Sequence, residues 1–191
     1  MIRVTPILLL IILFLLTGCG GKSIELEDDL SQRFKKAMTY FDKGKFSRSR
    51  DEFDFIIMND PGSGLAVEAQ YYMGESLFQM EEYHQSATAF DRYIRFSGDF
   101  SKLETARFRI CEAAVNSSNS YQRDQSQTHQ ALNQLQMFIE DYPGSERAAE
   151  AEGIITDLRI KLARKDYEAG RMYLKLEEYE SALIYFRSVL N

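Results

Sequence analysis

Few side chains in the 191-residue sequence have the types and spacing that covalent or metal chemistry requires. His84 and His129 stand alone, without the His-x-x-x-His or Glu-His spacing of a zinc site. Cys111 lies in an apolar helical pattern with no activating base near it in the sequence, which is typical of a buried, unreactive thiol. We therefore predict no catalytic cluster, no metal and no cofactor, and a protein that is not an enzyme. Cys19 is the exception, because of the segment that precedes it.

Cys19 ends a segment with the composition of an export signal. Arg3 precedes ten consecutive apolar residues, 7–16, which are too few to span a bilayer as a helix, since that takes about 20. The motif Leu16-Thr17-Gly18-Cys19 resembles a bacterial lipobox, in which the thiol is joined to diacylglycerol and the cysteine becomes the amino terminus. We predict a signal peptide over 1–18 and a lipid anchor of palmitate-like acyl chains at Cys19. An ordinary secretory signal that happens to contain Cys19 is the alternative.

The residues after the cysteine indicate where the protein is delivered. Gly20, not Asp, follows Cys19, which in bacterial lipoproteins resembles the signal for outer-membrane delivery. Residues 19–30 are predicted to form a lipidated tether. The rest of the chain is then expected at the periplasmic face of the outer membrane.

Composition excludes several other classes of protein. The chain has 23 basic and 29 acidic residues and a net charge of -6, and without basic clusters it is not expected to bind nucleic acid. Its two cysteines exclude a disulfide framework, because one of them is the predicted acylation site.

A repeat organises the rest of the sequence. The stretch from Gly74 to Tyr83 recurs from Gly170 to Tyr179, and each copy is followed seven residues later by an aromatic, Phe90 or Phe186. A third copy begins at Ala37. These offsets resemble the tetratricopeptide (TPR) pattern, in which a small residue lets helix A of each pair approach helix B closely.

The pattern predicts an all-α, TPR-type α-solenoid of about four helical pairs over 31–191. The pairs are expected at about 31–61, 66–98, 104–143 and 145–191, with a polar insertion at 116–128 and one long helix over about 145–175. Pro61 and Pro143 are expected to end helices. The array stops before the proline position of its last pair, so we expect either a partner at this end or a shortened version of a longer array.

Helix A of each TPR pair lines a concave groove. The groove positions of the first two pairs include four aromatic residues, Phe34, Phe41, Tyr71 and Phe78, which predicts binding of an extended or partly helical peptide with aromatic anchors. The alternative is that some of these rings are core between neighbouring A helices. The groove positions of the last pair are basic, at Arg164, Arg171 and Lys175.

A narrower resemblance is carried by the segment Phe90–Phe96, the insertion Arg123-Asp124-Gln125 and the turn Tyr142–Ser145. Together with the lipobox, these residues resemble the outer-membrane protein assembly factor BamD family. The resemblance implies a lipoprotein of the β-barrel assembly (Bam) machinery, with unfolded outer-membrane proteins, the barrel-forming subunit and other Bam lipoproteins as partners. It also implies that the later repeats dock the barrel-forming subunit, for which Arg123, Asp124, Arg164, Arg171 and Lys175 are the candidates. The family usually has five repeats, so this sequence lacks the fifth.

Two other classes stay open. One is a different TPR lipoprotein adaptor, such as a pilotin-like factor for secretin or pilus assembly, which would lack the insertion Arg123-Asp124-Gln125. The other is a cell-envelope enzyme, which would need a polar catalytic cluster that the sequence does not offer.

Overall fold

The computed structural model describes residues 21–190. The predicted signal peptide over 1–18 and the predicted anchor at Cys19 lie outside the described residues. All regular structure within 21–190 is helical. The α-helices are α2 (Gly21–Asp42), α3 (Phe46–Asn59), α4 (Gly64–Gln79), α5 (Tyr83–Phe96), α6 (Leu103–Ser117), α7 (Ser126–Asp141), α8 (Glu146–Lys175) and α9 (Tyr179–Ser188), with a short 3-10 helix η1 (Phe100–Lys102) before α6.

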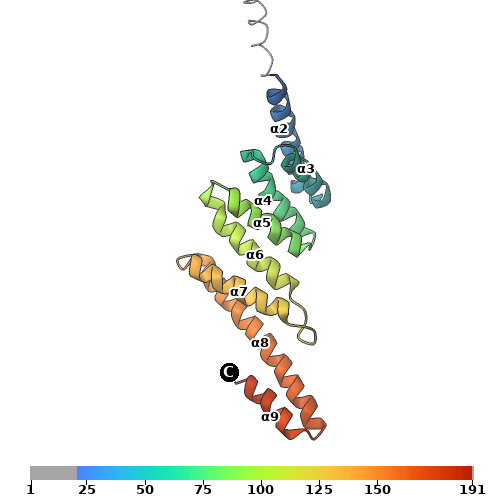
Figure 1. The fold of residues 1–191 in the computed structure, drawn as a ribbon, viewed down its shortest axis with the longest axis vertical. Helices are drawn as coiled ribbons and strands as arrows, with labels where there is room; N and C mark the ends of the chain where they lie inside the picture. Colours follow the sequence, from blue (N-terminus) through green and yellow to red (C-terminus); the bar gives the residue numbers. More distant parts are fainter. Residues whose placement is uncertain (1–20, 191) are drawn as a thin grey trace, which may run out of the picture.

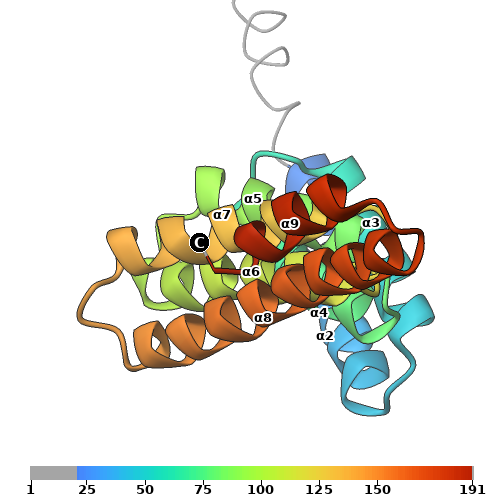
Figure 2. The same cartoon turned by 90° about the horizontal axis from the view of Figure 1, so that it is seen from below.

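The helices form an elongated stack in which each packs against the helices before and after it in the chain (Figure 1). Seen along the stack, α4, α6 and α8 lie toward one side, and α5, α7 and α9 lie toward the other (Figure 2). The four pairs are α2–α3, α4–α5, α6–α7 and α8–α9. This arrangement confirms the predicted all-α, TPR-type solenoid.

The small residue of the repeat brings the two helices of a pair into close contact. An ideal Cβ on Gly74 would lie only 3.0 Å from the ring of Phe90, and one on Gly170 would lie 2.7 Å from the ring of Phe186. In the second pair the approach also allows a buried hydrogen bond, because the hydroxyl of Ser86 donates to the carbonyl of Gly74 at 2.9 Å. A side chain larger than hydrogen at either glycine would separate the helices.

The turn inside three of the pairs has the same backbone form. Gly44, Glu81 and Glu177 occupy equivalent repeat positions and have φ values of 68°, 62° and 62°. In the second turn the amide of Glu82 donates to the carbonyl of Leu77 at 2.9 Å, which satisfies a carbonyl at the end of helix A. Glu81 and Glu177 adopt a conformation that glycine would adopt with less strain.

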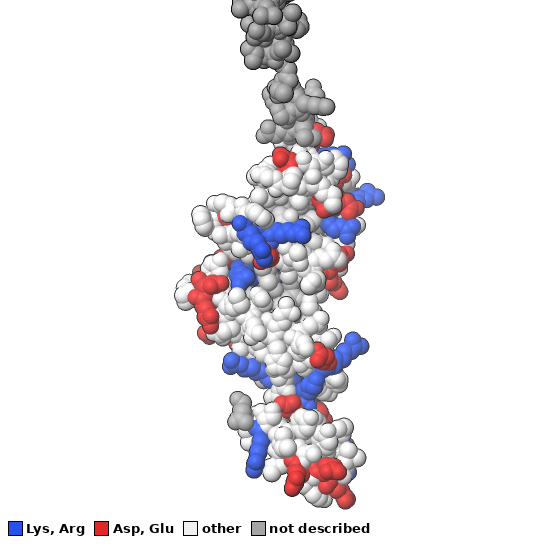
Figure 3. All heavy atoms as spheres, viewed as in Figure 1, with Lys and Arg blue, Asp and Glu red and all other residues white. Residues whose placement is uncertain are grey.

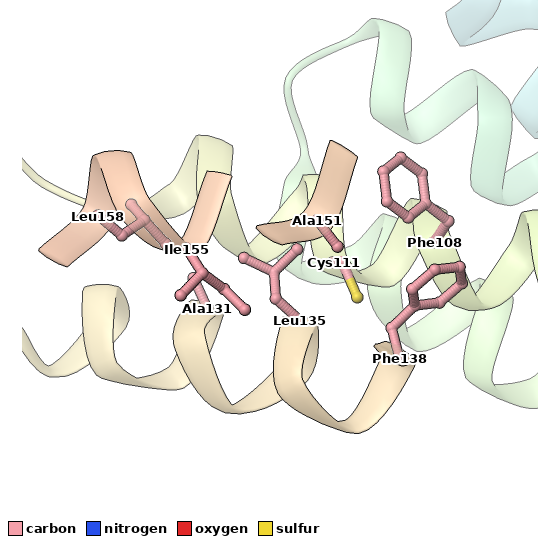
Figure 4. Close-up of a cluster of buried hydrophobic side chains, with 8 residues drawn as sticks. All are labelled: Phe108, Cys111, Ala131, Leu135, Phe138, Ala151, Ile155 and Leu158. Atoms are coloured by element: carbon pink, nitrogen blue, oxygen red, sulfur yellow. The ribbon is translucent and has the colours of Figure 1, made fainter. Parts of the chain in front are cut away.

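The apolar core is divided among the pairs, as expected for a repeat array. The largest cluster of buried side chains joins α6, α7 and the first half of α8, and Figure 4 shows its eight members, Phe108, Cys111, Ala131, Leu135, Phe138, Ala151, Ile155 and Leu158. Cys111 is fully buried, and its Sγ donates to the carbonyl of Gln134 at 3.3 Å. Burial raises the pKa of this thiol to about 12, which agrees with the predicted unreactive role.

The structure differs from the sequence prediction at the start of the array. α2 begins at Gly21, so residues 21–30, which we expected to belong to a tether, are helical. The physical reason is the spacing of Leu30, Phe34 and Ala37, which places them on one face of a helix. Leu30 and Ala37 are buried in the same cluster, so the helix has to extend to at least this point in order to pack.

The helix ends follow the predicted breakers. α3 ends at Asn59, two residues before Pro61, and α7 ends at Asp141, two residues before Pro143. Ser63 and Ser145 then cap the next helices, since their hydroxyls accept from the amides of Ala66 and Arg147, both at 3.0 Å. The predicted long helix is confirmed as α8, which has 30 residues.

Candidate functional site

The four predicted groove aromatics all lie on the A helices of the first two pairs. Phe34 and Phe41 belong to α2, Tyr71 and Phe78 belong to α4, and each is partly buried. Their rings are therefore both core and surface. We call the surface of α2, α4 and α6 that carries these residues and their charged neighbours the helix A face.

Tyr72 connects the aromatic rings of the first pair to the second. Its ring centroid lies 6.0 Å from that of Phe34 and 5.8 Å from that of Phe41, both edge to face. It also stacks on the buried ring of Phe53 at 5.9 Å. Because aromatic pairs at these distances attract one another, α2 and α4 present a continuous aromatic surface.

Tyr71 packs against two buried rings of α5. It packs edge to face against Phe90 at 5.5 Å and against Tyr93 at 5.1 Å between centroids. Burial raises the pKa of its hydroxyl to about 12, and the carboxylate of Glu75 acts in the same direction. The hydroxyl is thus a neutral hydrogen-bonding group at physiological pH.

Two ion pairs join α4 to the residues of the next repeat and border the aromatic surface. Lys102 forms an ion pair with Glu68, and its Nζ lies 5.1 Å from the centroid of the Tyr71 ring. Farther along α4, the carboxylate of Glu75 lies 2.9 Å from Arg109 Nε. Both cations therefore sit beside aromatic rings as well as carboxylates.

Arg109 connects three groups of the helix A face. Besides Glu75, its guanidinium bonds Glu112 at 2.8 Å and lies 5.1 Å from the ring centroid of Phe78. Burial disfavours its charged form, but Glu75 and Glu112 outweigh this effect and raise the pKa of Arg109. Glu75 is only 7% exposed, so this pair fixes the geometry of the face at its centre.

Sequence reasoning missed Lys102, Arg109 and Tyr72. A signal for two of them was present, since the partners of both ion pairs are 34 residues apart. That separation is the length of a TPR repeat, so it places two residues at the same level of neighbouring A helices. A search for opposite charges at this separation would include both pairs among its candidates, and the structure then decides which candidates are in contact.

The insertion between α6 and α7 is an ordered loop. Gln125 is buried, and its amide donates to the carbonyls of Ser120 and Arg123 at 2.8 and 2.9 Å. The carboxylate of Asp124 accepts from the side chain and the amide of Ser126, and these bonds lower its pKa. Gln125 therefore shapes the loop, while the side chains of Arg123 and Asp124 are exposed.

The loop rests on the middle of α8. Lys165 Nζ donates to the carbonyl of Arg123 at 2.7 Å, and Lys161 Nζ donates to the hydroxyl of Ser118 at 2.8 Å. The guanidinium of Arg164 lies 4.5 Å from the ring centroid of Tyr121. The structure thus brings Arg123, Asp124 and Arg164 to one surface, which we call the loop–α8 surface.

The other two predicted docking residues lie farther along α8. Arg171 follows Arg164 by two helical turns, about 10 Å, and pairs with Glu168 at 3.3 Å. Lys175 is in the last turn of the helix. They share the face of α8 that carries Arg164, by helical periodicity, but they do not touch the loop.

Charge is unevenly distributed on the face shown in Figure 3. Lys and Arg side chains gather at the level of α4 and α5 and again near the middle of α8, while acidic side chains gather at the turn between α8 and α9 (Figure 3).

Within residues 21–190 no group of three His, Cys, Asp or Glu residues could hold a metal ion. None of the described helices is both long and apolar enough to cross a membrane.

The fold and these surfaces define a class of protein, a TPR-type helical repeat protein with an aromatic, charge-bordered helix A face. The family follows from comparison of the sequence. The YfiO family model, described as outer membrane lipoprotein, matches residues 26–191. The chain belongs to this family, and its curated relatives are named BamD, which confirms the predicted resemblance.

Relatives of known name are distant but similar over nearly the whole chain. Outer membrane protein assembly factor BamD of Rickettsia prowazekii is 24% identical over 192 residues, which covers 96% of this chain and 74% of the relative. BamD of Caulobacter vibrioides is 24% identical over 179 residues, which covers 91% of this chain and 59% of the relative. The chain thus spans about three fifths to three quarters of the length of these two relatives.

One solved structure supports the fold alone. The MamA RS-1 ArsTM double mutant superimposes with a TM-score of 0.50 and 16% sequence identity, covering 85% of this chain and 93% of the other.

Proposed function

We propose that this protein is an outer-membrane lipoprotein of the β-barrel assembly (Bam) complex that acts as a scaffold for the insertion of outer-membrane proteins. In this role it binds unfolded outer-membrane proteins on the helix A face. The observation that carries the proposal is the set of half-buried rings on α2 and α4, bordered by Glu68–Lys102 and Glu75–Arg109. Because each ring is partly exposed, it can contact a client while the rest of the ring stays packed in the core.

The proposed clients fit this surface chemically. A segment of an unfolded outer-membrane protein in an extended conformation presents every second side chain to the same side. Apolar and aromatic side chains on that side can pack on Phe41, Tyr71 and Phe78. The neutral hydroxyl of Tyr71 can exchange hydrogen bonds with the client main chain. The fixed carboxylates and cations at the border of the face are unfavourable contacts for apolar client side chains. They therefore limit the number of client residues that the face holds at once.

The barrel-forming subunit is proposed to dock on the loop–α8 surface, through Arg123, Asp124 and Arg164. Arg171 and Lys175 would extend the contact along α8. An ordered loop whose charged side chains point to solvent can pair with a partner at little cost in conformational entropy. Anchoring at Cys19 would hold the scaffold at the periplasmic face of the outer membrane.

Site-specific photo-crosslinking in living cells tests client binding. A photoreactive residue at Phe41 or Tyr71 should trap newly exported, porin-like proteins, whereas one at the exposed Gln136 of α7 should not. Trapping of a secretin, with no porin-like protein at either position, would instead favour the pilotin-like adaptor. Trapping of neither class would count against the helix A face as a client site.

Docking and anchoring have separate tests. Arg123→Glu with Arg164→Glu should release the barrel-forming subunit during purification, while Arg159→Glu, an exposed charge reversal on the same helix, should not. If the double variant and Arg159→Glu released the subunit equally, docking on the loop–α8 surface would be refuted. Cys19→Ala should move the protein from the membrane to the soluble periplasmic fraction, and continued retention would contradict the lipid anchor.

A further inference from the structure

A second groove lies on the other side of α4, between the two B helices α3 and α5. It consists of two adjoining hollows that share Gln70 and Arg92, with volumes of about 410 Å³ and 260 Å³. Gln70, Met73 and Leu77 form its floor at the three- and four-residue spacing of one helix face. That face differs from the one that carries Tyr71. We call this feature the α3–α5 groove.

Gln70 is a polar group at the centre of the groove that lacks a partner. The residue is 5% exposed, and its Nε2 donates to no other group in the described part of the chain. A buried amide without a hydrogen bond is unfavourable and rare in folded proteins. Gln70 lines both hollows, so a rotation of its side-chain amide toward the groove would bring Nε2 to a carbonyl placed there.

The charges of the groove are balanced at one end only. Arg50 bonds Asp51 at 2.7 Å and approaches Glu82 at 3.7 Å, and the carboxylate of Asp54 also acts on it. Arg92 forms no ion pair with a carboxylate among residues 21–190, and the carboxylate of its neighbour Asp91 pairs with Arg95 at 2.7 Å. Asp51 and Asp54 also line the larger hollow, but both act on Arg50. Arg92 therefore lacks an ion pair of its own among the described residues, and the smaller hollow that it shares with Gln70 has no acidic lining residue.

The smaller hollow is apolar. Ile57, Val67 and Phe96 line it, together with Pro61. Phe96 is 72% exposed, so most of its ring is accessible to a ligand at the edge of this hollow. A phenylalanine or leucine side chain would cover this ring and fill the space between α3 and α5.

We propose that the α3–α5 groove binds an extended segment of a partner protein, in which an acidic residue lies two positions from an aromatic or large aliphatic residue. In an extended chain these two side chains point to the same side, about 7 Å apart. The carboxylate pairs with Arg92, the apolar side chain packs against Phe96, and a main-chain carbonyl of the segment accepts from Gln70 Nε2. This site is separate from the helix A face and can be occupied at the same time as it.

A labelled peptide tests the proposal on the full chain. The probe is a fluorescein-labelled Ser/Gly peptide of about eight residues with one aspartate two positions before one phenylalanine. Fluorescence polarisation should show saturable binding below about 1 mM, and Arg92→Gln should weaken it about tenfold, as expected for loss of a charge-assisted hydrogen bond. Gln70→Leu should weaken it similarly without unfolding the protein, since leucine has nearly the same volume and needs no partner.

Matched controls separate the groove from other surfaces. Arg95→Gln removes an exposed arginine three residues from Arg92 on the same helix and should leave the affinity unchanged. Peptides with asparagine for aspartate, or alanine for phenylalanine, should bind weakly to the unaltered protein. Lys102→Gln, at the border of the helix A face and outside both hollows, should not affect peptide binding, so the outcome is independent of the proposed client site.

Several results would overturn the proposal. These are no saturable binding of the peptide, equal affinity of the Arg92→Gln and Arg95→Gln variants, or a loss of binding with Lys102→Gln alone. Lipid vesicles with anionic headgroups provide the remaining test. If they sediment with the protein in a way that Phe96→Ser abolishes, while the peptide does not bind, Phe96 contacts a membrane and not a peptide.

Discussion

Replacing Gly74 with alanine tests the central packing contact of the array. The new Cβ would lie 3.0, 3.1 and 3.1 Å from three ring atoms of Phe90, whereas carbon atoms in favourable contact are about 3.5–4.0 Å apart. The ring has little space into which to retreat, because Phe90 is fully buried and Tyr71 packs on it at 5.5 Å. We expect α5 to shift away from α4.

The expected change in stability is a difference between two effects. Alanine in place of glycine inside a helix stabilises it by about 1 kcal/mol, while overpacking a core costs about 1–3 kcal/mol. The net result for Gly74→Ala is a loss of about 1 kcal/mol in the free energy of unfolding. For a chain of this length, that loss lowers Tm by about 2–4 °C.

Gly153→Ala is the matched control. Gly153 lies inside α8, and a Cβ there would meet nothing within 4 Å, so only the gain in helix propensity remains. We expect an increase of about 0.5–1 kcal/mol in the free energy of unfolding, measured by urea denaturation followed by circular dichroism. If both variants were equally stabilised, the close approach of α4 and α5 would not restrict position 74, and the packing explanation of the repeat would be refuted.

Three further predictions concern buried polar groups. Arg109→Met leaves Glu75 buried without its cation and should lower the free energy of unfolding by about 2 kcal/mol in urea denaturation; Glu75→Met on the same background should restore most of it, and no recovery would contradict the pairing. Ser86→Ala removes the buried hydrogen bond to the Gly74 carbonyl and should cost about 1 kcal/mol in the same assay, whereas an unchanged midpoint would mean that the bond contributes nothing. Burial raises the pKa of Cys111 in the folded state from about 9.0 to about 12, so the stability that its neutral thiol contributes is complete below pH 9 and is lost as the pH rises toward 12. Cys111→Ala should therefore make the decrease of Tm above pH 9 less steep, and parallel pH profiles of the two proteins would refute this assignment.

The helical pairs could be predicted because the signals for them are local. Gly74 and Phe90 are 16 residues apart within one pair, as are Gly170 and Phe186, and the structure brings each glycine against its aromatic partner. The same holds for the helix ends before Pro61 and Pro143. The tether over 19–30 stays a prediction, but its described residues 21–30 are helical, and Leu30 at its end belongs to the first core cluster, which its polar neighbours did not indicate.

The candidate site was less predictable because it depends on contacts between repeats. The sequence placed Phe34, Phe41, Tyr71 and Phe78 at groove positions but left open whether they were groove or core. The structure makes them partly buried, since each ring packs on a neighbouring helix while part of it stays accessible. The degree of burial follows from how far neighbouring A helices rotate and separate, and no single repeat encodes that.

By itself the sequence determined the class of fold, the family and the order of the helices. The class of fold and the order of the helices follow from spacings of fewer than about 20 residues along one or two helices, whereas the family was indicated by a resemblance in short segments such as Arg123-Asp124-Gln125 and shown by the family model. Only the tertiary structure decided the ion pairs Glu68–Lys102 and Glu75–Arg109, the docking of the insertion loop on α8, and the α3–α5 groove with its unpartnered Gln70. The reason is physical: a charge, a ring or an amide acquires its partner from the next repeat, and the packing of successive helices sets the distance between them.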